Sequence, residues 1–387
     1  MNQPLGILHV ISQLDGYGAA RMVRRLAARQ AAGGDRVTVV AFRAATPVVE
    51  ELRRAGVEVH VLNRRWGWDV IVVMRQMRLR RRMLVDVVHA WDAETLGYLL
   101  VGGWGAKPQA AGRARALVAT VERAPRTFAG AKAIQWGWRR VGMFATGNDA
   151  TRAWLVRQGV EGDRVRVIPP GVPPHDSHDR ALSRERLLAA LALPENAELV
   201  AIAGPLRRDR SLDEAIWAFE LVRVLHERAR LLVLGDGPDR RRLEQFASQV
   251  SEPGCVRFLG YRDDLADVLR HADVYWQPDE ALSTPLALLE ALAAGVPVVA
   301  SDVPAHRAAI VDGVNGRLAA HGSRADFARA TDELLNNLPL ARQLAAAAAH
   351  DACRLGSLDA ALAAYAALYR QALGDSGRRL RGEAHRR

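Results

Sequence analysis

Cysteine is nearly absent from this chain of 387 residues, which contains only Cys255 and Cys353. The two are far apart and lack metal-ligand spacing, so the sequence predicts neither a disulfide framework nor a zinc site. Long hydrophobic runs are also missing, since no apolar stretch approaches the roughly 18 residues of a membrane-spanning helix. Gly6 to Ser12 has the pattern of a strand, with no basic segment leading into an apolar one, so we expect no signal peptide. These absences favour a reducing cytoplasm.

Lysine is scarce as well, because only Lys107 and Lys132 among the 54 basic residues are not arginine. Such a bias can arise from the base composition of the gene, so the net charge of +11 carries little weight by itself. Its distribution is more informative. Residues 1–172 contain 27 basic and 13 acidic side chains, whereas residues 173–387 contain 27 and 30. The basic character therefore belongs to the first half.

Part of this excess lies between Arg64 and Arg82, where arginines and tryptophans are interleaved with apolar residues at helical spacing. Such a helix fits an anionic membrane surface, where each nearby cation contributes about 1 kcal/mol. A surface helix whose arginines simply face water is an equally good interpretation. Nucleic acid is a less favoured partner, because no nucleic-acid motif is present. A peripheral position on the inner face of the cytoplasmic membrane is the matching expectation.

Strand-like apolar runs alternate with helical patterns along the whole chain, which is typical of parallel sheets covered by helices on both faces. The length suggests two domains of this kind. A proline-rich stretch, Ile168 to Pro174, cannot be helical and is the expected linker. The sequence thus predicts an α/β protein with two Rossmann-like, doubly wound domains facing across a cleft, residues 1–172 and 173–357. Residues 358–376 are expected to form a helix that crosses back to the first domain, and 377–387 a basic disordered tail.

Several motifs of the second half have a family likeness. Leu231 to Pro238 reads LLVLGDGP, and Leu288 to Gly295 reads LLEALAAG. Together with the pattern along the rest of the chain, they resemble the donor-binding half of family 4 glycosyltransferases, which have the GT-B fold and use nucleotide-sugars. The resemblance implies a retaining, metal-independent sugar transfer to a hydroxyl acceptor held mainly by the first domain. No cofactor is implied besides the nucleotide-sugar donor.

The resemblance also suggests site residues. Arg210 occupies the position of the family's diphosphate-binding lysine, and Glu290 the position of the glutamate that meets the ribose. Arg207 or Arg208 could supply further positive charge, although a solvated arginine-rich loop is the alternative. Other donor-side positions are Gly16, Gly18, Tyr261, Arg262, Ser283, Thr284 and Leu286. On the acceptor side His89 and Asp92 follow from the likeness, and Glu122 stands beside the expected anomeric centre.

Five positions depart from the family pattern: Pro205, Leu282, Pro285, Ala308 and Glu122. Leu282 replaces the carboxylate that would meet the sugar, and Asp279 or Glu280 could reach the site from just upstream. Two other functions therefore remain open. One is a catalytically degenerate relative that binds nucleotides or acts as a scaffold, and the other is a nucleotide-sugar epimerase of the same architecture.

Overall fold

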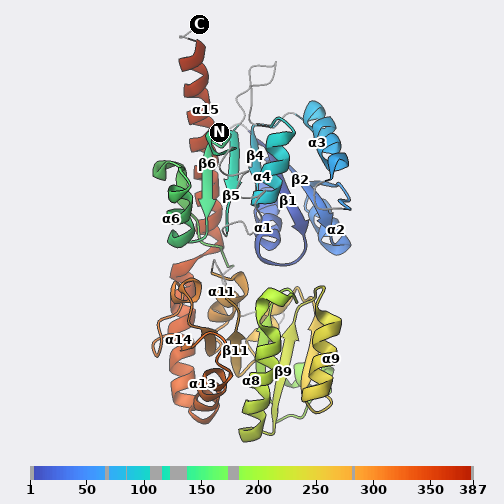
Figure 1. The fold of residues 1–387 in the computed structure, drawn as a ribbon, viewed down its shortest axis with the longest axis vertical. Helices are drawn as coiled ribbons and strands as arrows, with labels where there is room; N and C mark the ends of the chain where they lie inside the picture. Colours follow the sequence, from blue (N-terminus) through green and yellow to red (C-terminus); the bar gives the residue numbers. More distant parts are fainter. Residues whose placement is uncertain are drawn as a thin grey trace. The chain divides into compact units, whose positions relative to one another are not determined.

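The computed structural model describes residues 4–65, 69–83, 85–104, 116–122, 137–172, 183–280 and 284–384. The chain forms two compact units (Figure 1). The first comprises residues 1–169 together with 359–387, and the second residues 170–358. The sequence placed the divisions after residues 172 and 357.

A seven-stranded sheet forms the centre of the first unit, in the order β3-β2-β1-β4-β5-β6-β7 with every neighbouring pair parallel. Its strands are β1 (Gly6–Leu14), β2 (Arg36–Ala44), β3 (Glu58–Val61), β4 (Val87–Ala90), β5 (Ala116–Thr120), β6 (Met143–Thr146) and β7 (Val165–Val167). Its helices are α1 (Gly18–Ala32), α2 (Thr46–Arg54), α3 (Val70–Arg82), α4 (Ala93–Val101), α6 (Asp149–Arg157) and α15 (Leu358–Ala384). The strands are short runs rich in Val, Ile and Ala that are buried on both faces.

The second unit contains a six-stranded parallel sheet in the order β10-β9-β8-β11-β12-β13. Its strands are β8 (Glu198–Ala203), β9 (Ala229–Leu234), β10 (Val256–Gly260), β11 (Val274–Gln277), β12 (Val298–Ser301) and β13 (Arg317–Ala319). Its helices are α7 (Arg184–Ala190), α8 (Leu212–Leu225), α9 (Arg240–Val250), α10 (Leu265–Leu269), α11 (Leu286–Ala293), α12 (Pro304–Arg307), α13 (Arg324–Asn336) and α14 (Leu338–Leu355). Two hydrophobic clusters flank this sheet, one on each face. The predicted pair of Rossmann-like sheets is confirmed.

Each sheet has a point at which the order of the strands reverses. In the first unit the reversal lies between β1 and β4, and in the second unit between β8 and β11. Open α/β sheets bind ligands outside the carboxyl ends of the strands at such a point, because the two flanking loops there diverge. The loops that follow these four strands are therefore the places to look for a site.

Helix α15 extends the chain's last predicted helix. It runs to Ala384, so residues 377–384 are helical and the prediction of a disordered tail is wrong for them. Six of these eight residues are Arg, Leu, Glu or Ala, which favour helix, and the stretch contains no proline, although Gly377 and Gly382 are poor helix formers. Residues 385–387 lie outside the described part of the chain.

In the described ranges, none of the helices combines the length and the apolar character that crossing a bilayer requires.

Candidate functional site

Arg210 lies at the reversal point of the second sheet, in the loop that follows β8. Its side chain is only 10 % exposed, and its Nε is 3.1 Å from Oδ2 of Asp279, which follows β11. Its Nη2 donates to the carbonyl oxygen of Ala203, the last residue of β8, at 3.1 Å. A buried arginine is thus held between the two strands where a ligand of this fold is expected.

The loop that carries Arg210 is packed tightly against the turn after β9. A Cβ on Gly235 would lie 1.9 Å from the carbonyl oxygen of Gly204, and a Cβ on Gly237 would lie 2.3 Å from that of Leu206. Backbone hydrogen bonds from Gly204 to Leu234 and from Leu206 to Asp236 join the same two segments. The glycines of the GDGP motif therefore allow a close approach of two backbones, which fixes the loop.

Further ionisable groups surround this arginine. Glu290 is buried on α11, and it acts electrostatically on the hydroxyl of Tyr275, as do Arg210 and Asp279. His306 on α12 is completely buried, and its Nδ1 is 2.8 Å from the carbonyl oxygen of Ser301. Burial lowers the pKa of His306, so the imidazole is neutral at pH 7.

The other donor-side arginines form surface ion pairs. Arg207 contacts Asp209 at 3.2 Å, and Arg208 contacts Asp239 at 3.8 Å with its side chain 81 % exposed. Such pairs are weak and are easily exchanged for a ligand, so both remain candidates for phosphate contact.

Tyr261 and Arg262 follow β10, the edge strand. The Tyr261 hydroxyl donates to Asp263 at 2.6 Å, and Arg262 makes a two-pronged pair with Asp264 that raises the pKa of the guanidinium. Strand β10 is two positions from β8, so these side chains begin roughly 10 Å from the reversal point.

Residues near the start of α11 are placed differently from one another. The Thr284 hydroxyl donates to the carbonyl oxygen of Ala305 at 3.2 Å, which joins this segment to α12. Leu286 packs its side chain into the hydrophobic core, so only its backbone can serve a ligand. Leu282 and Ser283 lie outside the described residues.

The first unit's glycine loop follows β1. Gly18 has a left-handed φ of +41°, and the Gly16 carbonyl oxygen accepts a hydrogen bond from the Nε of buried Arg21 at 2.9 Å. The Tyr17 N–H donates to Asp15 at 3.0 Å. The sequence analysis assigned no role to Arg21, and nothing in the pattern of α1 distinguishes it from the other three arginines of the helix, which are less buried.

His89 does not reach the surface of the first unit, although the sequence placed it on the acceptor side. It is completely buried, with Nδ1 2.8 Å from the hydroxyl of Tyr369 and Nε2 2.7 Å from that of Thr120. Both ring nitrogens are therefore occupied by the protein, and Tyr369 belongs to α15. This placement argues against acceptor contact by His89, because the ring is buried and both of its nitrogens have protein partners.

A second histidine continues this buried cluster. His9 is also completely buried, with Nδ1 3.0 Å from the Trp91 indole nitrogen and Nε2 2.8 Å from Gln30. Burial lowers the pKa of His9 to about 4. Burial also holds the pKa of His89 well below its ordinary value, with a smaller contribution from repulsion by a protonated His9. Both rings are neutral at pH 7.

Asp92 and Glu122 follow the ends of β4 and β5 and have different surroundings. Asp92 caps α4 by accepting from the Thr95 N–H at 2.7 Å, and its other oxygen accepts from the Ser12 N–H at 2.9 Å. It thereby joins the ends of β1 and β4, which is a structural task. Glu122 follows β5 and is half-buried, and its charge acts on the hydroxyl of Tyr365.

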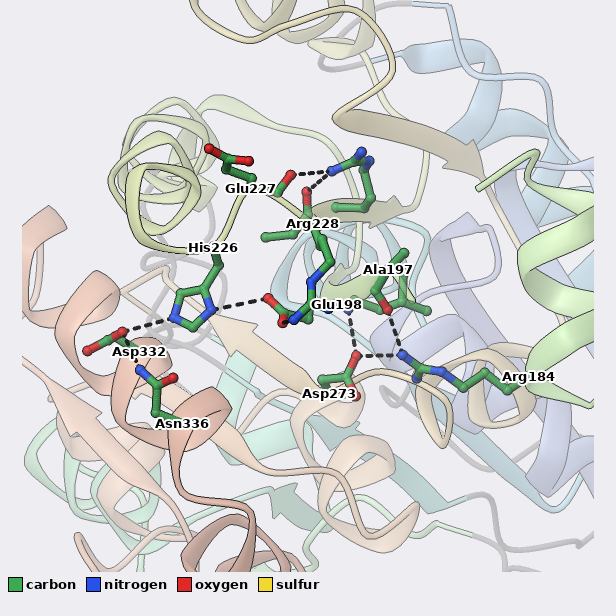
Figure 2. A network of polar contacts seen from close by, with 12 residues as sticks. Arg184, Ala197, Glu198, His226, Glu227, Arg228, Asp273, Asp332 and Asn336 are labelled. Carbon is green, nitrogen blue, oxygen red and sulfur yellow. Dashed lines mark hydrogen bonds and ion pairs between the residues drawn. The ribbon is translucent and has the colours of Figure 1, made fainter. Parts of the chain in front are cut away.

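A different polar network lies at the amino ends of the strands in the second sheet (Figure 2). His226 lies between Glu198 and Asp332, with ring nitrogens 3.2 and 2.9 Å from the carboxylates. Arg184 pairs with Asp273 at 2.8 Å just before β11 begins. These residues mark the amino ends of β8, β9 and β11, where α/β folds hold structural rather than ligand-binding contacts.

Comparisons with known proteins agree with this picture. The model described as Glycosyltransferase Family 4 matches residues 17–176, and the model described as Glycosyl transferases group 1 matches residues 183–351. A D-inositol 3-phosphate glycosyltransferase from Stackebrandtia nassauensis is 34% identical over 205 residues, which are 50% of this chain and 45% of that protein. A phosphatidyl-myo-inositol mannosyltransferase from Mycobacterium leprae is 33% identical over 218 residues, 55% of each chain. The chain thus spans about half the length of the curated relatives it matches.

Solved structures match over more of the chain at lower identity. Anabaena HepE in complex with UDP-glucose has a TM-score of 0.79 and 18% identity, and the match covers 95% of this chain and 98% of that one. Sucrose-phosphate synthase from Thermosynechococcus elongatus has a TM-score of 0.76 and 17% identity with the same coverage. These likenesses show the fold. The resemblance seen in the sequence is confirmed, and the chain belongs to the group 1, or family 4, glycosyltransferases with the GT-B fold.

Proposed function

We propose that this chain transfers a sugar from a nucleoside-diphosphate sugar to a hydroxyl acceptor with retention of configuration and without a metal. The observation that carries the proposal is the position of Arg210 at the reversal point of the second sheet, in a chain matched by glycosyltransferase models on both halves. A cation there is where a departing diphosphate needs it.

The proposed chemistry breaks the bond between the anomeric carbon and the β-phosphate oxygen. The acceptor hydroxyl attacks the same face of the sugar, and its proton passes to the departing phosphate. Arg210 stabilises the negative charge that develops on that phosphate, with help from Arg207 or Arg208. Glu290 holds the ribose, and Tyr261 and Arg262 lie toward the base.

The names of the relatives suggest where to look for acceptors. One relative is named for D-inositol 3-phosphate and another for phosphatidyl-myo-inositol. Because UDP-glucose is bound to the structural neighbour HepE, a UDP-sugar is the first donor to test. We therefore include phosphorylated inositols, free and lipid-linked, among the hydroxyl acceptors.

A membrane surface is the proposed location of the reaction. Helix α3 exposes the apolar residues Val70, Ile71, Met74 and Met77, which fall within about a third of the helix circumference. Exposed Arg75 and Arg82 border this stripe on one side, and exposed Arg78 lies within it, between Met74 and Ile71 around the helix. The combination fits an anionic lipid surface, where apolar side chains insert and arginines meet headgroups. Trp66 and Trp68, part of the same prediction, lie outside the described residues.

Arg64 does not share this role. Its side chain forms an ion pair with Glu94 and lies over the Phe42 ring at 5.7 Å. The proposed membrane face is therefore α3 itself.

Vesicles containing anionic lipid should retain the protein at low salt, and charge reversal of Arg78 and Arg82 should release it. Equal retention of the reversed variant contradicts the membrane proposal.

The activity is tested by incubating the protein with UDP-, GDP- and ADP-sugars and inositol-phosphate acceptors. We expect release of nucleoside diphosphate that depends on the acceptor, and a product whose anomeric proton coupling shows retention. Interconverted donor sugars without an acceptor would identify an epimerase. Tight nucleotide binding without any turnover would identify a catalytically degenerate relative.

A further inference from the structure

A chain of buried polar side chains leads from strand β11 to Arg210. The Tyr275 hydroxyl donates to Oε1 of Gln277 at 2.7 Å, and Nε2 of Gln277 donates to Oδ1 of Asp279. The other oxygen of Asp279 pairs with Arg210. Tyr275, Gln277 and Asp279 alternate along the chain, so they share one face at the end of a strand whose other residues are apolar.

This arrangement is costly unless it is complete, because a buried polar group without a partner loses its hydration and gains nothing. Tyr275 and Gln277 are completely buried, and Asp279 is 6 % exposed. A core of apolar residues would stabilise the sheet as well or better. This series of hydrogen-bonded side chains lies at the reversal point of the sheet, where a ligand is expected, and that position suggests a role in ligand binding.

The contacts of Arg210 leave one edge of its guanidinium open. Nε faces Asp279 and Nη2 faces the Ala203 carbonyl oxygen, but within the described part of the chain Nη1 makes no hydrogen bond. Nη1 lies beside Gly204, where a Cβ would be 2.2 Å from it. The planar guanidinium is therefore locked in orientation, with one donor edge available for an anion.

We propose that Asp279 is a positioning residue that fixes Arg210 so that its Nη1 edge receives the donor's diphosphate. This inference rests on the proposed function and names a residue that acts in it. Asp279 balances the charge of the buried arginine and holds it in place before the ligand arrives, so less ordering is required on binding. Removing one partner of a buried ion pair leaves the other uncompensated, and the arginine then turns away toward water.

The test compares Asp279→Asn with Asp273→Asn by calorimetric titration with UDP, GDP and ADP and with the matching nucleosides. Asp273 is a matched control, because it also pairs with an arginine but at the opposite end of the same strand. We expect Asp279→Asn to weaken the diphosphate that wild type binds by about tenfold or more and to change nucleoside affinity less than twofold. Asp273→Asn should change neither.

A thermodynamic cycle shows whether Asp279 acts through Arg210. In an Arg210→Gln background, adding Asp279→Asn should weaken diphosphate binding by less than a further twofold, because the group to be positioned is gone. Asp279→Glu keeps the charge and protects the fold if the asparagine variant is unstable. It should still weaken the diphosphate several-fold, because its carboxylate is displaced by one methylene.

Three results would overturn the inference: diphosphate affinity that is unchanged or tighter in Asp279→Asn, equal losses for nucleoside and diphosphate, or additive effects in the cycle. Tighter binding would mean that Asp279 competes with the ligand for Arg210. A wild type that binds none of the diphosphates contradicts the proposed function and the inference together. Wild-type binding that survives Asp279→Asn contradicts the inference alone.

Discussion

Gly204 leaves the space that the guanidinium of Arg210 occupies. It has a φ of +133°, and an added methyl would overlap the guanidinium. We expect Gly204→Ala to displace Arg210, to lower the free energy of unfolding by about 1–3 kcal/mol and to weaken diphosphate binding about tenfold. Chemical denaturation and calorimetric titration measure the two effects.

Gly322→Ala is the matched control for this substitution. Gly322 also has a left-handed φ, of +78°, but a Cβ there would meet no atom within 4 Å. Its replacement should cost only backbone strain, about 1–2 kcal/mol, and leave nucleotide affinity unchanged. If both alanine variants bind diphosphate equally well, Gly204 is not needed to keep Arg210 in place.

The two buried histidines predict how the stability of the first unit depends on pH. The pKa of His9 is about 4 in the folded protein and 6.5 in its ordinary state, so the unfolded chain binds the proton more readily. Its contribution to stability is therefore complete above pH 6.5 and is lost as the pH falls toward 4, by roughly 3 kcal/mol in total. His89 adds a loss of the same sign.

Thermal unfolding between pH 7.5 and pH 4.5 measures this loss. We expect His9→Asn to flatten the decline in melting temperature, because one of the two buried protonation sites is gone. His350→Gln should not flatten it, since that side chain is 76% exposed. An unchanged pH dependence in His9→Asn would mean that other groups cause the decline.

At the scale of elements, helix α15 is fastened to the first sheet by its tyrosines. Tyr369 bonds to His89 from β4, and the rings of Tyr365 and Trp91 lie 5.3 Å apart. We expect Tyr369→Phe to lower the free energy of unfolding by about 1–3 kcal/mol, because the buried imidazole loses a partner. Hydrogen exchange should rise in α15 and in β4.

Tyr261→Phe makes the same chemical change where the hydroxyl bonds to Asp263 in a solvent-exposed position. It should alter stability by less than about 0.5 kcal/mol. Exchange in α15 that is equal in the two variants would show that the hydroxyl of Tyr369 does not fasten the helix.

The elements themselves were largely readable from the chain. Strands such as β2 and β9 can be recognised by their nearly continuous apolar runs, and the helices by apolar residues at helical spacing. Strands β6 and β7 and helix α6 were not predicted. The two strands are only four and three residues long, but β11 and β13 are equally short and were predicted, so length alone does not explain the omission.

The site was readable only in part. The positions of Arg210 and Glu290 follow from motifs with local spacing, and both lie in the second unit at buried positions. The pairing of Arg210 with Asp279 depends on the order of strands in the sheet, and the burial of His89 depends on a tyrosine 280 residues away. Both contacts join residues that are far apart in the sequence, so a local sequence pattern cannot predict them.

At the scale of the whole molecule, the two units differ in how the chain builds them. The second unit is one continuous segment, 170–358, whereas the first needs residues 359–387 in addition to 1–169. We expect a fragment of residues 170–358 to unfold cooperatively by circular dichroism. A fragment of residues 1–169 should not, because α15 covers buried residues of its sheet.

Adding a peptide of residues 359–384 to the 1–169 fragment should restore cooperative unfolding, because it supplies Tyr365 and Tyr369. A peptide in which both tyrosines are replaced by serine is the control and should fail. Cooperative unfolding of residues 1–169 alone would contradict this view of the first unit.

The fastening of α15 also has a consequence for biosynthesis. A ribosome makes the strands of the first unit early, but the helix that covers His89 emerges only after the whole second unit has been translated. The first sheet therefore stays partly uncovered while some 190 further residues are synthesised. The second unit can therefore complete its fold before the first unit does, although the strands of the first unit are synthesised earlier.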